Sequence, residues 1–153
     1  METMKIMLVD DEERFLSTTL KLLTKKGIDA VTAASGAEAL EKLNHKHIHV
    51  VILDVKMPGM DGNETLKEIK RQFPLVEIIM LTGHATVESA IDGLKSGATD
   101  YLMKPTDIDE LMAKAGEAFQ KRQMLEEKIV MAQSRQYMKS PREILKEAEN
   151  PKH

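Results

Sequence analysis

The sequence predicts an α/β protein built on a doubly wound, five-stranded parallel sheet. Five short apolar runs recur along the chain, and segments with helical spacing of apolar residues separate them. This alternation of strands and helices is typical of a parallel sheet with helices on both faces. Three of the runs, residues 6–9, 50–53 and 78–81, are apolar at every position, as expected of strands buried on both faces.

The other two runs, residues 28–33 and 99–103, complete the expected set of strands. Right-handed crossovers between parallel strands are nearly obligatory, and five strands favour the flavodoxin-like order 2-1-3-4-5. In sheets of this kind, ligands bind outside the carboxyl ends of the strands. The residues that follow each strand are therefore the candidates for a functional site.

The helices are predicted by apolar stripes and by the residues that begin or end them. Gly27 ends the first helix, because glycine readily adopts the left-handed backbone that closes a helix. Pro74 ends the third, because the residue before a proline is restricted away from the helical region. The side chains expected to cap the other helices are Ser35 with Glu38 in the second, Thr86 in the fourth, and Thr106 with Asp109 in the fifth.

The chain of 153 residues is long enough for one domain and a modest extension. We expect a domain over residues 4–122 and a helical tail over residues 123–153. The absence of cysteine excludes a disulfide, a zinc–thiolate site and a thiol nucleophile. No apolar stretch reaches the roughly 20 residues of a membrane span, and the N-terminus lacks the form of a signal peptide. These features predict a cytoplasmic protein without a membrane partner.

Charge is distributed unevenly along the chain. Residues 1–120 carry 14 Lys/Arg and 20 Asp/Glu, a net charge of −6, whereas residues 121–153 carry 8 and 5, a net charge of +3. No basic stripe crosses the main domain, and aromatic residues make up only 3% of the chain. Direct binding of nucleic acid by residues 1–122 is therefore not expected.

The tail has helix-forming composition over residues 123–139 and is expected to prolong the fifth helix. Met124, Met131 and Met138 recur every seven residues, but polar residues occupy the partner positions, so the pattern favours a coiled coil only weakly. Residues 140–143 combine a serine cap, a proline at the first helical position and a glutamate two positions further on, which predicts a short last helix near residues 141–149.

Polar side chains end four of the expected strands. Asp10 and Asp11 follow the first strand, Asp54 follows the third, Thr82 ends the fourth, and Lys104 follows the fifth. Because the carboxyl ends of parallel strands meet at one edge of a sheet, we expect these five residues to converge there.

Such a cluster has a definite chemistry. Two carboxylates about 4 Å apart repel by on the order of 4 kcal/mol at an effective dielectric constant near 20, and a proton or a cation must relieve that repulsion. Carboxylate oxygens without histidine or cysteine ligands favour Mg²⁺, which bridges readily to phosphate oxygens. Mg²⁺, a lysine ammonium and a hydroxyl together stabilise a phosphoryl group in transfer, and an aspartate can accept it. The residues therefore predict Mg²⁺-assisted phosphorylation of an aspartate.

The chain also resembles the receiver domains of two-component response regulators, over roughly residues 4–122. Each motif is weak alone, but all occur in order at the spacing of that family. The segment 81–105 is most similar to receivers of sigma-54-dependent transcriptional activators. The matching motifs are Asp10-Asp11, Asp54 with Met57-Pro58 and Asp61-Gly62, Leu81-Thr82-Gly83, and Tyr101-Leu102-Met103-Lys104-Pro105.

The resemblance implies that Asp54 accepts a phosphoryl group from a histidine kinase or a phosphotransfer protein, in a reaction that the receiver itself catalyses, as it does the later dephosphorylation. Mg²⁺ would be held by Asp11 and Asp54 with the backbone carbonyl of Lys56, and by Asp10 directly or through water. Lys56 and His84 occupy positions that tune hydrolysis of the aspartyl phosphate in the family, although solvated loop side chains are an equal alternative.

The resemblance further implies that Lys104 pairs with the phosphoryl oxygens, that Thr82 moves to hydrogen-bond them, and that Tyr101 turns inward behind Thr82. The peptide bond between Lys104 and Pro105 would be cis. The surface that changes would comprise the fourth helix, the fifth strand and the fifth helix. It would bind a downstream protein target or a second copy of the chain.

Other interpretations remain open. A Mg²⁺-dependent phosphohydrolase also uses an aspartate at a strand end, but it needs a second acid two residues later, where this chain has Lys56. A module that acts without phosphorylation would not need the acids. The chain is expected to be a stand-alone receiver, with an N-terminal fragment of a longer transcriptional regulator as the alternative. His45, His47 and His49 alternate before the third strand, which indicates a metal site or, more simply, a solvated turn.

Overall fold

A computed structural model of the chain describes residues 3–57, 59–83 and 86–137. The chain divides into two compact units, with the boundary between Arg122 and Gln123. The first unit contains the whole sheet. The strands and helices, in chain order, are β1 (Lys5–Val9), α1 (Glu13–Lys25), β2 (Asp29–Ala33), α2 (Gly36–His45), β3 (Val50–Leu53), α3 (Gly62–Gln72), β4 (Glu77–Thr82), α4 (Val87–Lys95), β5 (Asp100–Met103) and α5 (Ile108–Tyr137).

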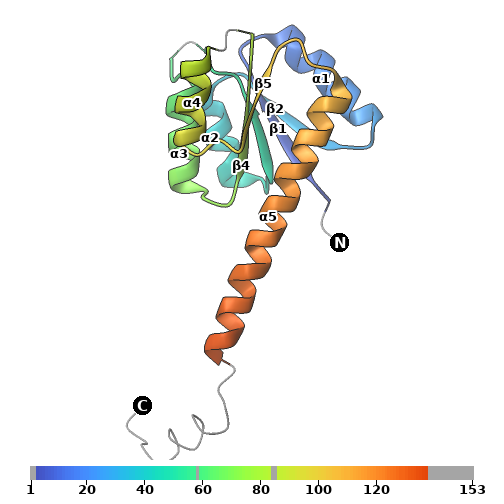
Figure 1. Cartoon of the computed structure of the whole chain (residues 1–153). Coiled ribbons are helices and arrows are strands. Elements are labelled where there is room, and N and C mark those ends of the chain that lie inside the picture. The colour runs from blue at the N-terminus through green and yellow to red at the C-terminus, as the bar shows by residue number, and fades with distance from the viewer. Residues whose placement is uncertain (1–2, 58, 84–85, 138–153) are drawn as a thin grey trace, which may run out of the picture. The chain divides into compact units, whose positions relative to one another are not determined.

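The five strands form one parallel sheet in the order β2-β1-β3-β4-β5. The predicted flavodoxin-like fold is therefore confirmed. Figure 1 shows α2, α3 and α4 on one side of this sheet, and α1 with residues 108–122 of α5 on the other. The two central strands, β3 and β4, are buried at every position, which explains their uninterrupted apolar sequences.

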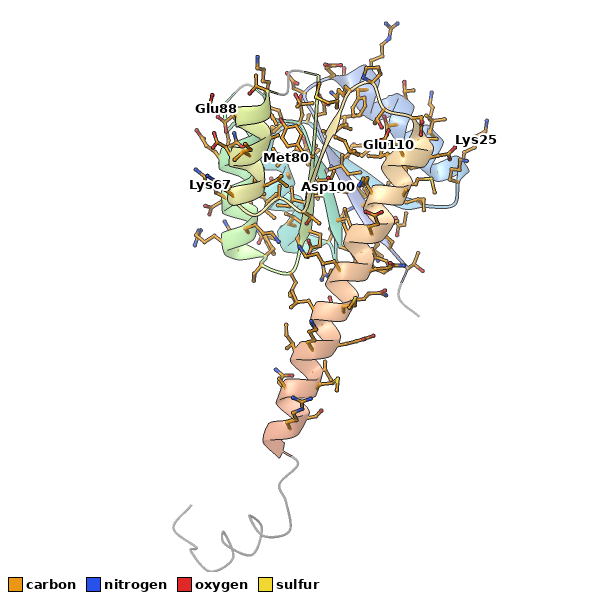
Figure 2. All side chains as sticks on the ribbon, in the orientation of Figure 1. Lys25, Lys67, Met80, Glu88, Asp100 and Glu110 are labelled. Atoms are coloured by element: carbon orange, nitrogen blue, oxygen red, sulfur yellow. The ribbon has the colours of Figure 1, made fainter. Side chains whose placement is uncertain are left out.

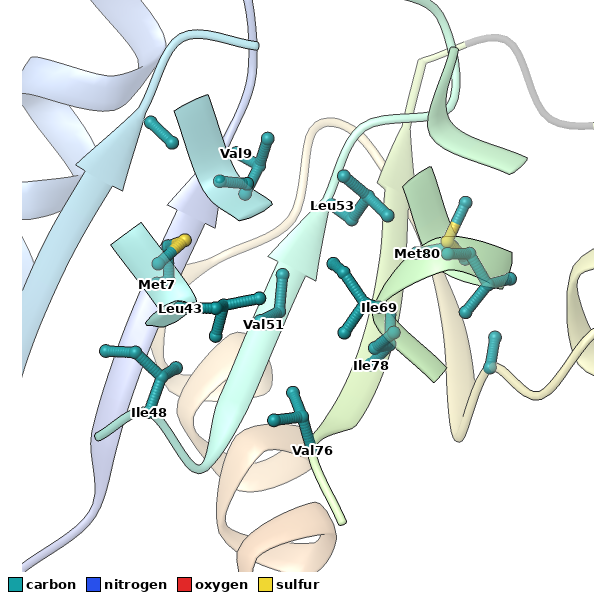
Figure 3. Packing of buried hydrophobic residues seen from close by; sticks show 14 of the residues in the cluster. Met7, Val9, Leu43, Ile48, Val51, Leu53, Ile69, Val76, Ile78 and Met80 are labelled. Carbon is teal, nitrogen blue, oxygen red and sulfur yellow. The ribbon is translucent and has the colours of Figure 1, made fainter. Parts of the chain in front are cut away.

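Each face of the sheet packs its own apolar core. Under α2 and α3, side chains from β1, β3 and β4 meet Leu43, Leu66 and Ile69, as Figure 3 shows for most of this layer. Under α1 and α5, the alternate side chains of the same strands meet Leu16, Leu23 and Leu111. Figure 2 shows the contrast within the first unit: Met80 lies among the side chains of the interior, whereas Lys25, Lys67, Glu88 and Glu110 lie on its outside.

The helix caps agree with the sequence at most positions. The Ser35 hydroxyl accepts a hydrogen bond from the Glu38 backbone N–H, and Thr86 forms a complete capping box with Ser89. The predicted cap of α5 is wrong by one residue, because the Asp107 carboxylate, and not Thr106, accepts from the Glu110 backbone N–H at 2.7 Å. The Thr106 hydroxyl instead donates to the Glu110 side chain at 2.9 Å.

The amino end of the sheet, opposite the candidate site, buries charged side chains. Glu77 is the first residue of β4; its carboxylate accepts a hydrogen bond from the Thr99 hydroxyl and lies 3.7 Å from Lys121 Nζ. Arg122 is buried, and its guanidinium donates to the Ile48 carbonyl at 2.8 Å. These contacts join residues 121 and 122 of α5 to the amino ends of β3 and β4.

We expect Arg122→Met to lower the free energy of unfolding by about 2 kcal/mol, because a charged donor is lost and the Ile48 carbonyl stays buried. Chemical denaturation of the full chain measures the change. The exposed Arg71, whose guanidinium pairs with Glu68 on the surface of α3, provides the control. Arg71→Met should leave the free energy of unfolding close to that of the wild type, because an exposed ion pair contributes little. Equal losses in the two variants would contradict this account of Arg122.

The interpretation of the histidines before β3 as part of a solvated turn is wrong for His49, whereas His45 and His47 are exposed. His49 is fully buried, and its Nδ1 accepts a hydrogen bond from the Lys5 backbone N–H at 3.0 Å. Its ring packs edge-on against Phe119, with centroids 4.9 Å apart. Because its own backbone N–H bonds the Lys5 carbonyl, His49 is held at the start of the sheet. Within the described ranges, His45, His47 and His49 do not gather into a group of metal ligands.

The second unit begins within α5, which continues as a helix to Tyr137. The expected prolongation of the fifth helix is therefore confirmed as far as that residue. Met124 and Met131 are exposed, while Met138 and the short helix predicted near residues 141–149 lie outside the described residues. Within the part of the chain that the structure describes, no helix has the length and apolar character needed to cross a bilayer.

Candidate functional site

The sheet brings the predicted site residues to one edge by extending its hydrogen-bond pattern one residue past the strand ends. The Asp54 backbone N–H donates to the Val9 carbonyl at 2.9 Å, which fixes Asp54 beside the end of β1. The Lys104 backbone N–H donates to the Thr82 carbonyl at 2.9 Å, which fixes Lys104 beside the end of β4. The backbone, and not a flexible loop, therefore sets the positions of these side chains.

Three carboxylates gather at this edge. Asp10, Asp11 and Asp54 each offer one oxygen, and these oxygens all lie within 4.8 Å of one another. Asp10 is 1% exposed and Asp54 is 7% exposed, whereas Asp11 faces solvent. In the described parts of the chain this is the one cluster of three acidic or histidine side chains with metal-ligand spacing. Its hard oxygen donors and its open side suit a divalent cation that keeps water or phosphate among its ligands.

Lys104 supplies positive charge beside the acids. Its ammonium forms an ion pair with the Asp10 carboxylate, lies 3.9 Å from Glu12 Oε1, and sits 4.2 Å from the centroid of the Phe15 ring. The other Asp10 oxygen accepts a hydrogen bond from the Glu12 backbone N–H at 2.9 Å. Lys104 is therefore held over the site by two different attractions, one ionic and one cation–π.

Burial raises the pKa of Asp54, and the negative charge of Asp10 raises it further. Three groups act in the opposite direction on that pKa: the Lys104 ammonium, the Lys56 backbone N–H and the Thr82 hydroxyl, the last two by hydrogen bonding. The net rise means that the ionised form of Asp54 lacks compensation in this structure. A cation placed among the three acids would supply it.

The loop after Asp54 turns tightly into α3. Met57 is buried, and Asp61 caps α3 by accepting a hydrogen bond from the Glu64 backbone N–H at 2.8 Å. Gly62 begins α3 against the backbone of the site, where a Cβ would lie 2.2 Å from the Asp54 carbonyl oxygen. Only glycine fits this approach without a shift of the backbone.

Tyr101 lies on β5, partly buried, and its hydroxyl is 3.3 Å from the Ser89 hydroxyl on α4. The Lys56 side chain is exposed, and His84 lies outside the described residues. The peptide bond between Lys104 and Pro105 is cis. Sequence reasoning did not identify Phe15 or Ser89 as neighbours of the site, because their contacts join helices to distant strands and leave no local pattern.

Comparison with known proteins agrees with this geometry. The sequence model of the response regulator receiver domain matches residues 6–116 of the chain. The chain belongs to this family. The receiver domain accounts for the sheet, the strand-end acids and Lys104. This fold and this site correspond to the class of phosphoacceptor switches in two-component signalling.

Sequence relatives of this receiver are regulators that are much longer than the chain. The transcriptional regulatory protein ZraR of Klebsiella oxytoca is 40% identical over 117 residues, which cover 76% of this chain and 26% of ZraR. The DNA-binding transcriptional regulator NtrC of Klebsiella pneumoniae is 40% identical over 106 residues, which cover 69% of this chain and 23% of NtrC. The receiver thus spans about a quarter of the length of these relatives.

Solved structures also match the receiver, both as a separate domain and within a longer protein. The CheY-like response regulator receiver domain protein of Methanospirillum hungatei JF-1 superposes with a TM-score of 0.76 at 30% identity, covering 80% of this chain and 98% of that one. NtrX of Brucella abortus superposes with a TM-score of 0.78 at 30% identity, covering 85% of this chain and 30% of NtrX. The predicted resemblance to receivers of sigma-54-dependent activators is confirmed by these relatives.

Proposed function

We propose that Asp54 is the phosphoacceptor of this receiver and that it takes a phosphoryl group from the phosphohistidine of a kinase or phosphotransfer protein. An Asp54 oxygen forms the new P–O bond, the P–N bond to the donor imidazole breaks, and the imidazole leaves with a proton. The observation that carries the proposal is the gathering of Asp10, Asp11 and Asp54 beside Lys104 at the ends of the central strands.

Mg²⁺ fits the donor set, and bound there it would neutralise charge on the transferring phosphoryl oxygens. Asp11 and Asp54 would hold it directly, with the Lys56 backbone carbonyl, and Asp10 directly or through water. The receiver's own residues do the rest. The sheet holds the backbone of Asp54 beside the end of β1, and the open side next to Asp11 would admit the donor.

Lys104 and Thr82 are proposed to bind the phosphoryl oxygens once they are in place. Both already act on Asp54: the Lys104 ammonium by charge and the Thr82 hydroxyl by hydrogen bonding. Drawing them toward a doubly charged group would pull on β4 and β5, and Tyr101 would turn inward behind Thr82. Lys56 and His84 are proposed to tune the later attack of water on the aspartyl phosphate.

The proposal is tested by incubating the full chain with acetyl phosphate, with Mg²⁺ or with EDTA, and measuring intact mass and peptide fragments. We expect the mass to rise by one phosphoryl group only with Mg²⁺, with the modification on Asp54. Beryllofluoride, a stable mimic of the phosphoryl group, should bind at the same residue. A chain that gains no phosphoryl group, or gains it equally in EDTA, would overturn the proposal.

The output surface is proposed to be α4 with β5 and α5. Ile91 and Leu94 on α4 are 45% and 46% exposed, and Met103 on β5 is 50% exposed. Apolar side chains gathered on neighbouring elements are characteristic of a surface that binds another protein. The partner would be a downstream protein or a second copy of the chain. This surface would serve equally in a chain that acts alone and in a receiver within a longer transcriptional regulator.

We expect the double substitution Ile91→Lys and Leu94→Lys to weaken self-association through this face while leaving phosphorylation unchanged. Sedimentation velocity with Mg²⁺ and beryllofluoride should show the wild type associating and the variant at least about tenfold weaker, because two exposed apolar anchors become charged. Leu22→Lys on α1, where Leu22 is 42% exposed, is the matched control and should associate like the wild type. Weakening by the α1 substitution alone would place the interface elsewhere.

A further inference from the structure

The hydroxyl of Ser89 is the centre of a small hydrogen-bond network at the start of α4. It accepts from the Thr86 backbone N–H at 3.0 Å and donates to the Thr86 carbonyl at 3.0 Å. It also lies 3.3 Å from the Tyr101 hydroxyl. A serine hydroxyl has one proton, which the Thr86 carbonyl takes, so the Tyr101 hydroxyl is the donor in the third bond.

Tyr101 touches α4 at a second point one turn further along. Gly93 is the one buried residue among the α4 positions whose burial is described. A Cβ added there would lie 3.6 Å from the Tyr101 ring, with Met80 of β4 next to it. Ser89 and Gly93 are four residues apart and therefore share a face of the helix. In Figure 2, Glu88 marks the first turn of α4 and Asp100 marks the start of β5, the two elements that this side chain connects.

The other α4 side chains whose burial is described are exposed or only half-buried. Ile91, Leu94 and the charged residues of the helix are exposed. A helix with so few buried contacts belongs to the low-stability part of a structure, where a single hydrogen bond changes populations. The Tyr101 ring and hydroxyl therefore form a large part of what fixes the first two turns of α4.

We propose that Ser89 is a positioning residue of the switch: its hydroxyl retains Tyr101 against α4 in the unphosphorylated receiver. This inference rests on the function proposed above. When Tyr101 leaves to follow Thr82, the hydrogen bond to Ser89 breaks and the start of α4 loses a tether. Ser89 therefore opposes the phosphorylated conformation and sets how much phosphoryl-binding energy is needed to reach it.

The test measures the affinity of the full chain for beryllofluoride in the presence of Mg²⁺. The amide NMR signals of α4 report the binding. Removing a bond made only in the unphosphorylated conformation should tighten the apparent affinity by about threefold to tenfold, the equilibrium factor of one neutral hydrogen bond. Ser89→Ala and Tyr101→Phe should each show this gain, and the double variant should gain no more than either alone. Ser89→Thr, which retains the hydroxyl, should return to the wild-type affinity.

Thr86→Ala separates the tether from simple loss of the helix cap. It removes the side chain that caps α4 but leaves the Ser89 and Tyr101 hydroxyls in place. Thr86→Ala should therefore lower thermal stability. Its effect on the apparent affinity for beryllofluoride should add to that of Tyr101→Phe. Unchanged or weaker beryllofluoride binding by Ser89→Ala, or additive gains in the Ser89 and Tyr101 pair, would overturn the inference while leaving the proposed function intact. Absence of binding by the wild type would remove both.

Discussion

Asp54→Asn should abolish phosphorylation by acetyl phosphate, with no modified peptide detectable by mass spectrometry. The amide keeps the shape of the side chain but lacks the anionic oxygen that forms the new P–O bond. The affinity for Mg²⁺, measured by NMR titration, should fall at least about tenfold because one of three gathered carboxylates is neutralised. Phosphorylation of Asp54→Asn at the wild-type level would place the acceptor on another residue.

The same substitution should stabilise the metal-free protein. The folded-state pKa of Asp54 is raised, by burial first and by Asp10 second, so ionising it costs folding stability as pH rises through that pKa. In EDTA near neutral pH, Asp54→Asn should therefore unfold at a higher denaturant concentration than the wild type. Below about pH 3, where aspartates are largely protonated in both states, the gain should disappear.

Asp29→Asn is the matched control for both measurements. Asp29 is exposed at the start of β2, at the opposite end of the sheet from the acids. Its neutralisation should leave phosphorylation, Mg²⁺ affinity and the pH dependence of stability close to those of the wild type. Matching effects in the two variants would mean that net charge, and not the position of Asp54, is responsible.

The sheet could be predicted from the sequence because each strand is marked by its own short apolar run, and several runs give the same indication. Runs such as 50–53 and 78–81 are apolar at every position, and topology then sends the polar residues after them to one edge. The same reasoning predicts that Asp10, Asp54 and Thr82 lie together at that edge. It required no knowledge of side-chain contacts, since the backbone pattern alone determines where parallel strands end.

The features that the sequence did not predict depend on contacts between distant segments, or on a choice between two neighbouring residues that are equally good helix caps. The contact of Lys104 with the Phe15 ring and the hydrogen bond between Tyr101 and Ser89 depend on how α1 and α4 are rotated about their axes. No local run of residues encodes that rotation. Thr106 and Asp107 are both good caps one position apart, and only the backbone at the start of α5 selects Asp107. His49 looked like a turn residue because histidine is polar, although its ring fills space beside Phe119.

Gly62→Ala should disrupt the site from outside the acid cluster. The added Cβ would lie 2.2 Å from the Asp54 carbonyl oxygen and 2.5 Å from the Val55 Cα, both backbone atoms that cannot rotate away. The start of α3 must therefore move from the strand end, breaking the hydrogen bond from the Gly62 N–H to the Val55 carbonyl. We expect a loss of about 3 kcal/mol in unfolding free energy, measured by denaturation, and slower phosphorylation by acetyl phosphate.

Gly116→Ala provides a control with the opposite sign. Gly116 lies inside α5, and an added Cβ would meet nothing within 4 Å. Alanine is favoured over glycine in a helix interior by about 1 kcal/mol, so this variant should be more stable than the wild type and should be phosphorylated at the same rate. The two substitutions add the same methyl group, so a difference in sign isolates the close approach at Asp54 as its cause. If Gly62→Ala were as stable and as readily phosphorylated as Gly116→Ala, the tight packing of α3 against the end of β3 would have no part in holding the site.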